Sequence, residues 1–188
     1  MRSYSGNNGG TPRTGFVKLN AVPVWQGSWR GKYPKKRGVN TILVDPLNCS
    51  AQESRHFDTW GDSNAAIQLR NYLQQVNREN IIVGVTADEP VRYLADAQST
   101  LSDIGVDVAD VQRRGSFAFV EQQGFPTKTV FRKALTEAES NANPAHINAT
   151  ITGSIGCELR GRTFVGLFHN DDDDDKNNKC KNAVYTHC

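Results

Sequence analysis

The sequence lacks long apolar runs. None of its 188 residues lie in an uninterrupted apolar stretch of about eighteen residues, the length that a membrane-spanning helix needs. We therefore predict no membrane span. Met1 is not followed by a basic segment and an apolar segment, as in a secretory signal. If the protein is exported, we expect this sequence to be a processed or recombinant form.

The common catalytic and metal-binding motifs are also missing. The four cysteines include no CxxC pair, and no HExxH, GxSxG or Walker motif occurs. The acidic run at 171–175 has neither the alternating ligands nor the central glycine of a calcium-binding EF-hand loop. His56 and Asp58 stand two residues apart, but no nucleophile accompanies them. We predict a protein that is not an enzyme and has no metal or cofactor.

Acidic residues are absent from the first 37 positions, which hold eight Lys or Arg. No nucleic-acid-binding motif accompanies this basic segment, so we predict no nucleic-acid partner. The segment reads instead as a solvated arm. Its charge is opposite to that of the acidic run at 171–175, and pairing of the two between molecules would allow self-association.

Alternating and helical patterns predict an α+β fold. Strands are expected at 16–25 (with Pro23 indicating an edge), at 39–46, at 81–85, at 116–122 and within 146–168. Apolar residues at helical spacing predict helices near 63–78 and 90–104. The expected architecture is a twisted, mainly antiparallel β-sandwich with two or three short helices.

A doubly wound nucleotide-binding fold is the alternative for a chain that alternates strands and helices. That fold needs a glycine-rich turn where the pyrophosphate meets a helix N-terminus. After the strand at 81–85 the chain instead reads Thr-Ala-Asp-Glu-Pro, which places carboxylates there. The nucleotide-binding reading fails for that reason.

Three units are predicted along the chain. Residues 1–15 are rich in glycine, asparagine and serine and read as a flexible arm. Residues 16–170 would form a single domain, with its recognisable core at 37–125. Residues 171–188 would form an acidic tail that contains cysteine.

An ordered series of short motifs resembles the GG-type domain, also called the interleukin-like or pancreatic-derived-factor-like domain. The motifs are Arg-Gly-Val-Asn at 37–40, Phe-Asp-Thr-Trp at 57–60, Asp-Glu at 88–89 and Arg-Gly-Ser-Phe-Ala-Phe at 114–119. This family includes secreted cytokine-like proteins, cell-surface hyaluronan-processing proteins and the stem of protein O-mannose N-acetylglucosaminyltransferase. The resemblance implies that the crowded motif at 57–60 is architectural, with Phe57 in the core and Asp58 bonding the backbone before a helix.

The same resemblance implies a carbohydrate site. In the transferase stem, N-acetylglucosamine is bound at the family positions matched by Asp88 and Arg114. A carboxylate accepts hydrogen bonds from sugar hydroxyls, and a guanidinium donates to ring or acetamido oxygens. We expect both side chains to face solvent. The stem has an aromatic residue where this chain has Arg113, so Phe117 or Trp60 would have to supply any stacking surface.

Paired cysteines and two N-glycosylation sequons favour an extracellular setting. The sequons begin at Asn48 and Asn148. We predict two disulfides, with the pairing left open, among Cys49, Cys157, Cys180 and Cys188.

The sequence thus predicts a secreted, non-catalytic, lectin-like glycoprotein whose partner is a glycan, and the resemblance implies a glycan that contains an N-acetylhexosamine. Two alternatives remain open. One is a self-assembling structural protein of the extracellular matrix, and the other is a cytokine-like receptor ligand.

Overall fold

The protein is represented by a computed structural model. It describes residues 2–3, 13–19, 22–29, 36–46, 48–122, 129–136, 139 and 145–147. The strands predicted beyond residue 147 and the acidic tail lie outside the described residues. Strands occupy residues 2–3 and 13–15 of the segment predicted as a flexible arm. The predicted domain boundaries stay a prediction.

A five-stranded antiparallel sheet is the centre of the molecule. Its strand order is β5-β4-β6-β7-β8, and every neighbouring pair is antiparallel. The strands are β4 (Gly38–Asp45), β5 (Ser50–Phe57), β6 (Ile81–Ala87), β7 (Ser116–Gln122) and β8 (Thr129–Leu135). The strands predicted at 39–46, 81–85 and 116–122 are confirmed as β4, β6 and β7.

A second, smaller sheet has the order β3-β2-β1-β9. It consists mainly of the hairpin of β2 (Arg13–Leu19) and β3 (Val22–Trp29), extended by β1 (Arg2–Ser3) and β9 (Ala145–His146). The single strand predicted at 16–25 is wrong, because the chain reverses between Leu19 and Val22. Pro23 does lie on an edge strand, as its missing N–H requires.

Two helices complete the described fold, α1 (Ala65–Gln75) and α2 (Ala95–Asp103). Both are shorter than predicted. Asp62 accepts a hydrogen bond from the Asn64 N–H instead of capping the helix itself, so α1 begins two residues later than expected. Pro90 is not in the first turn of α2, because the chain from 91 to 94 forms a separate turn held by Thr59.

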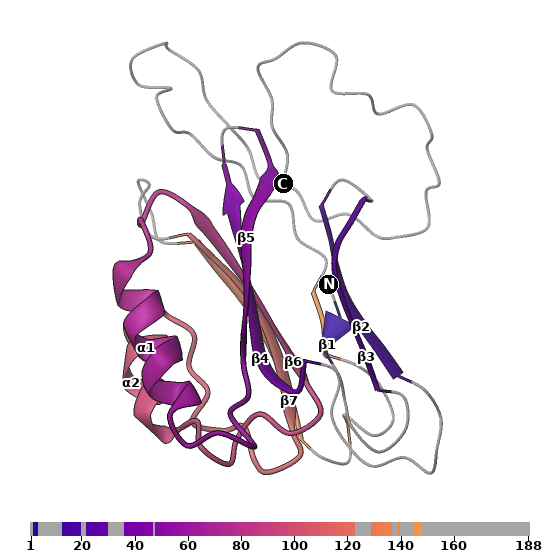
Figure 1. Ribbon diagram of the computed structural model, residues 1–188, viewed down its shortest axis with the longest axis vertical. Coiled ribbons are helices and arrows are strands. Elements are labelled where there is room, and N and C mark those ends of the chain that lie inside the picture. The colour runs from indigo at the N-terminus through magenta and orange to yellow at the C-terminus, as the bar shows by residue number, and fades with distance from the viewer. Residues whose placement is uncertain are drawn as a thin grey trace.

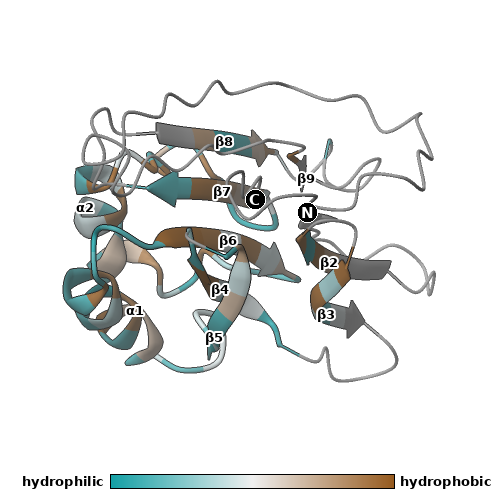
Figure 2. Cartoon of the chain, turned by 90° about the horizontal axis from the view of Figure 1, so that it is seen from above, coloured by the Kyte–Doolittle hydropathy of each residue, from teal (hydrophilic) through white to brown (hydrophobic). Residues whose placement is uncertain are grey.

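The elements form three layers, with the five-stranded sheet between the helix pair and the smaller sheet (Figure 1). Apolar side chains on the two faces of the central sheet form two separate clusters. Figure 2 shows this apolar character along β4, β6 and β7, the three inner strands of the sheet. The inner strands are therefore apolar on both faces, as expected for strands covered on both sides.

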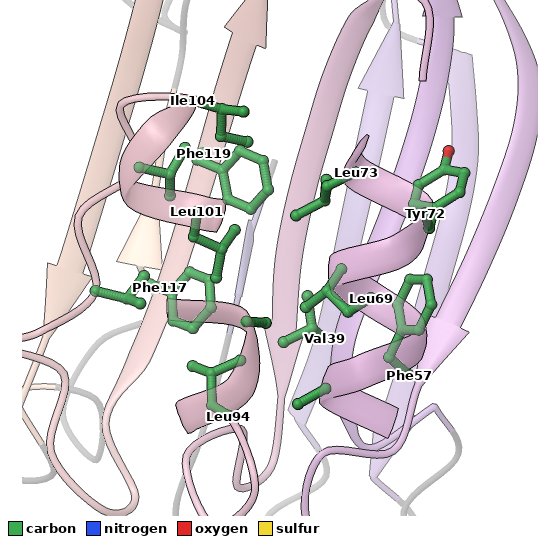
Figure 3. Close-up of a cluster of buried hydrophobic side chains, with 14 of the residues drawn as sticks. Val39, Phe57, Leu69, Tyr72, Leu73, Leu94, Leu101, Ile104, Phe117 and Phe119 are labelled. Atoms are coloured by element: carbon green, nitrogen blue, oxygen red, sulfur yellow. The ribbon is translucent and has the colours of Figure 1, made fainter. Parts of the chain in front are cut away.

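Alternation along each inner strand assigns its side chains to one cluster or the other. On β7, Phe117 and Phe119 pack with the helices, whereas Ala118 and Val120 pack against the smaller sheet. Figure 3 shows Phe117 and Phe119 directed toward Leu101 of α2. On β6 the position beside the Phe119 ring is a glycine, Gly84, and any added Cβ would collide with that ring.

The predicted α+β class is confirmed. The described elements form two antiparallel sheets and two helices, and α1 contacts α2 on one side of the five-stranded sheet. A doubly wound fold is excluded for this part of the chain, because it requires a parallel sheet with helices on both faces. Neither described helix is long and apolar enough to cross a membrane.

Candidate functional site

Four chain segments meet at one end of the five-stranded sheet. The register pairs Gly38 with Ala87 and Val39 with Phe57, so the start of β4 lies beside the ends of β5 and β6. Val85 pairs with Ala118, which places the start of β7 beside the end of β6. This end is the lower one in Figure 1. The motifs at 37–40, 57–60, 88–89 and 114–119 therefore converge in space.

The Phe-Asp-Thr-Trp motif builds the turn between β5 and α1. Phe57 is buried among the helix-side apolar residues, as predicted. The Asp58 carboxylate accepts from the Gly61 N–H at 2.9 Å, which confirms its predicted bond to the backbone. The same carboxylate receives two hydrogen bonds from Arg37, Nε to Oδ1 at 2.9 Å and Nη2 to Oδ2 at 2.7 Å. This two-pronged pair joins the start of β4 to the turn.

His56 also contacts this arginine. One of its ring nitrogens lies against the Arg37 carbonyl oxygen. His56 and Asp58 thus contact the backbone and the side chain of one residue, respectively. This arrangement gives both of them a structural role.

Thr59 ties the turn to the loop that follows β6. Its hydroxyl donates to the Pro90 carbonyl oxygen at 2.6 Å, and its own carbonyl accepts from the Tyr93 N–H at 2.8 Å. Thr59 is fully buried. The loop that carries Asp88 is therefore fixed to the Phe-Asp-Thr-Trp turn.

Asp88 and Arg114 both have left-handed backbone conformations, with φ of 57° and 60°. Such conformations are uncommon for residues other than glycine, and they cluster at functional sites. Glu89 joins the loop after β6 to the loop before β7, because its buried carboxylate accepts hydrogen bonds from both loops. Its Oε2 accepts from the Arg114 N–H at 2.6 Å, and its Oε1 accepts from the Val91 N–H at 2.9 Å.

Both candidate sugar-binding side chains are partly buried, and the expectation that they face solvent is wrong. Burial raises the pKa of Asp88, and the positive charges of Arg37 and Arg114 partly offset that rise. Glu89, the next residue after Asp88, accepts a hydrogen bond from the Arg114 N–H, so the backbones of Asp88 and Arg114 lie close together. The structure therefore brings Asp88 and Arg114 together, as the sequence predicts.

The carboxyl group of Glu89 has a raised pKa as well. Burial of the Glu89 carboxyl raises its pKa, while the N–H groups of Val91 and Arg114 act in the opposite direction. The roles of Glu89 and of the Arg37–Asp58 pair were not predicted from the sequence. The signal for Glu89 was its place between an aspartate and a proline at the end of an apolar strand, where a carboxylate needs backbone donors if it is buried.

Phe117 cannot provide a stacking surface for a sugar, because it is fully buried between the sheet and the helices. Trp60 is half-buried, and two guanidinium groups lie over its ring. The distances from the ring centroid to the guanidinium carbons are 4.9 Å for Arg92 and 5.9 Å for Arg113. Trp60 is therefore engaged with arginines.

The other predicted site residues fall partly outside the described chain. Asn48 is exposed, and its side-chain oxygen accepts from the Ser50 N–H. Cys49 is buried. The remaining residues, Asn148, Cys157, Cys180 and Cys188, lie outside the described residues, so the two disulfides and the glycosylation stay predictions. Within the described chain, no group of three or more His, Cys, Asp or Glu is placed to hold a metal ion.

The Arg37–Asp58 pair predicts an acid-sensitive contribution to stability. Burial opposes ionisation of Asp58, but the bonds from Arg37 and the Gly61 N–H outweigh it and lower its pKa. Because the folded-state pKa is the lower one, this stabilisation is present above the unfolded value, about 3.9, and is lost as pH falls through the folded value. At neutral pH we expect Asp58→Asn to lower the free energy of unfolding by about 1.5–3 kcal/mol.

Urea unfolding of both proteins at several pH values measures this effect. The difference in unfolding free energy between wild type and Asp58→Asn should shrink as the pH falls below about 4. A difference that stays constant down to the most acidic pH would show that the ionised carboxylate contributes nothing.

The geometry defines a cluster of loops at the end of an α+β sandwich, and this cluster presents the Asp88 carboxylate and several guanidinium groups. Comparison with protein families identifies the domain. Residues 37–125 match the model of the interleukin-like EMT inducer family. This domain therefore belongs to that family, the GG-type domain that the sequence motifs indicate. A search of curated proteins found no match to the chain.

Proposed function

We propose that this protein is an extracellular, non-catalytic carbohydrate-binding module whose site is built around Asp88 and Arg114. The observation that carries the proposal is the paired left-handed backbone at these two residues, 57° and 60° in φ. The buried Glu89 carboxylate joins their loops through the Arg114 N–H. A chain keeps two such conformations side by side when the surrounding structure fixes them, and this is a common property of binding sites.

The chemistry of the pair suits a sugar. An ionised Asp88 accepts hydrogen bonds from two neighbouring hydroxyls, and the Arg114 guanidinium donates to ring or acetamido oxygens. Each exposed bond contributes about 0.5–1.5 kcal/mol, so a single monosaccharide should bind with roughly millimolar affinity. Stronger binding would require several sugar residues or several copies of the protein.

Preorganisation supports the proposal further. The Arg37–Asp58 pair and the Thr59 bonds fix the neighbouring loop, so ligand binding would order few groups. We expect an N-acetylhexosamine-containing glycan, no cofactor and no catalytic step. The two sequons and four cysteines support a secreted protein.

The test is a glycan array probed with the wild type and with Asp88→Asn and Arg114→Gln. Asparagine tolerates the left-handed conformation and keeps the shape of Asp88 while removing its charge. We expect both variants to lose detectable binding. Matched controls are Arg78→Gln and Glu79→Gln, two exposed residues in the turn between α1 and β6 at the opposite end of the sheet.

Because Asp88 and Arg114 are partly buried, each variant must first give the wild-type unfolding curve. Folded variants that still bind the same glycans would place the site elsewhere. An array with no signal for the wild type would favour the matrix or receptor-ligand alternatives. Sedimentation at low and physiological salt then separates those two, because pairing of opposite charge blocks weakens as salt rises.

A further inference from the structure

A second group of cations lies beside the proposed sugar site. Arg92 and Arg113 are exposed, and both guanidinium groups lie over the half-buried Trp60 ring. Arg92 also lies 4.8 Å from the centroid of the Tyr93 ring. We call Trp60, Arg92 and Arg113 the arginine–tryptophan cluster.

The aromatic ring acts on the two arginines as a support. A guanidinium that lies over an aromatic face keeps its N–H groups available at its edge. Long side chains ordinarily lose rotamer entropy when they bind, and a supporting ring reduces that loss. The cluster therefore presents two partly ordered hydrogen-bond donors.

The carboxylates near this end of the sheet are engaged with other groups. Asp58 is paired with Arg37, and Glu89 is buried against two backbone N–H groups. Within the described chain, neither Arg92 nor Arg113 has an ion pair or a hydrogen bond. Arg113 interacts electrostatically with the buried Glu89 carboxyl but forms no ion pair with it. Two exposed guanidinium groups over one aromatic ring, neither of them paired with a carboxylate, make a site for an anion.

The cluster is continuous with the proposed sugar site. Arg113 directly precedes Arg114, and Arg92 follows Pro90, whose carbonyl oxygen is bonded to Thr59 beside Trp60. A sugar at Asp88 and Arg114 would therefore have the cluster as its neighbour along the surface.

We propose that the arginine–tryptophan cluster is an adjoining subsite that binds a negatively charged sugar residue, so that the ligand is an acidic oligosaccharide. The inference rests on the proposed function, since it extends the site at Asp88 and Arg114 by one sugar. A carboxylate or sulfate group on that sugar accepts hydrogen bonds from Arg92 and Arg113. Both kinds of acidic group have the planar or clustered oxygens that guanidinium groups bind best.

Isothermal titration calorimetry with three related probes tests the proposal. The probes are an unsulfated chondroitin tetrasaccharide, its sulfated counterpart and its carboxyl-reduced, unsulfated and therefore neutral counterpart. We expect the acidic probes to bind about tenfold more tightly than the neutral one, because charge-assisted hydrogen bonds are the stronger kind. Comparison of the first two probes shows whether a sulfate group strengthens the binding that the carboxylates provide.

Variants separate this subsite from the first. Arg92→Gln/Arg113→Gln should remove the preference for the acidic probes and leave the affinity for the neutral probe unchanged. Arg78→Gln, the matched control, should leave both affinities unchanged. The wild-type preference should also weaken between 0.05 and 0.5 M salt, since exposed charges are screened.

The outcomes are distinguishable. Equal affinity for acidic and neutral probes would overturn the subsite but leave the sugar site at Asp88 and Arg114 intact. Acidic binding that is lost in the double arginine variant but unaffected by Asp88→Asn would support the cluster and overturn the proposed function. An acidic peptide, such as a glutamate hexamer, that displaces the tetrasaccharide and binds as tightly would overturn the assignment to a glycan.

Discussion

Replacing Gly38 with alanine is expected to lower the free energy of unfolding by about 3 kcal/mol. Gly38 has a φ of +95°, a region that costs an L-residue roughly 1–2 kcal/mol. An added Cβ would also meet the Phe57 carbonyl oxygen and the Thr59 amide nitrogen, the second at 2.7 Å. These are backbone atoms of the turn that carries Asp58, and overpacking against them adds about 1–3 kcal/mol.

Gly105→Ala is the matched control, because Gly105 has a φ of +88° and lies at the end of α2, away from that turn. Urea unfolding at neutral pH measures both variants. Gly38→Ala should be the more damaging by at least the overpacking cost, about 1 kcal/mol. Equal losses in the two variants would mean that the strand start does not depend on close approach of the turn.

The packing of Phe119 against Gly84 predicts the second large effect. Phe119 is fully buried in the helix-side core, and Phe→Ala substitutions at such positions cost about 3–5 kcal/mol. Gly84→Ala inserts a methyl group into the space of the Phe119 ring and should cost about 1–3 kcal/mol. The contact between Gly84 and the Phe119 ring joins β6 to β7, so the two substitutions should not act independently.

A double-mutant cycle tests this reading. In Gly84→Ala/Phe119→Ala the ring that the methyl group would strike is gone, so the double variant should be more stable than the sum of the single losses predicts. Coupling of about 1 kcal/mol or more is expected for residues in direct contact. Strict additivity of the three unfolding free energies would contradict the packing described for these strands.

Local patterns predicted the inner part of the fold well. Strands β4, β6 and β7 are apolar on both faces, so their sequences are distinctive wherever they pair. Strand β5 was not predicted, because it is an edge strand whose residues are mostly exposed and polar, including Glu53 and Arg55. Hydrogen bonding to β4 makes this segment a strand, although its own residues show no apolar alternation.

Contacts between distant residues account for the other differences. Sequence spacing suggested a helix from Pro90, but Thr59, 31 residues away, binds the Pro90 carbonyl and keeps that segment in a turn. The Glu89 carboxylate likewise accepts a hydrogen bond from the Arg114 N–H, 25 residues further along the chain. The apolar pattern of a segment cannot predict a contact between such distant residues. The family resemblance, in contrast, did indicate Arg114, which makes this bond, and Asp88, which precedes Glu89.

The resemblance also suggested a role for the Trp60 ring, sugar stacking, that does not fit its contacts with two arginines. From the sequence, Trp60 was a candidate to replace the aromatic residue that the family has where this chain has Arg113. The structure shows that Arg113 and Trp60 are neighbours and that Arg92 joins them over the ring. The departure from the family pattern therefore changes the charge beside the site.

The most direct test of the central claim is a titration of the isotopically labelled protein with N-acetylglucosamine, followed by two-dimensional NMR of the backbone amides. We predict shifts that saturate at millimolar sugar and are confined to the amides of residues 88, 89, 91 and 113–115, with none in β2 or β3 on the far side of the central sheet. The Asp88→Asn protein should show no shifts. Shifts elsewhere on the molecule, or shifts that persist in Asp88→Asn, would contradict the account.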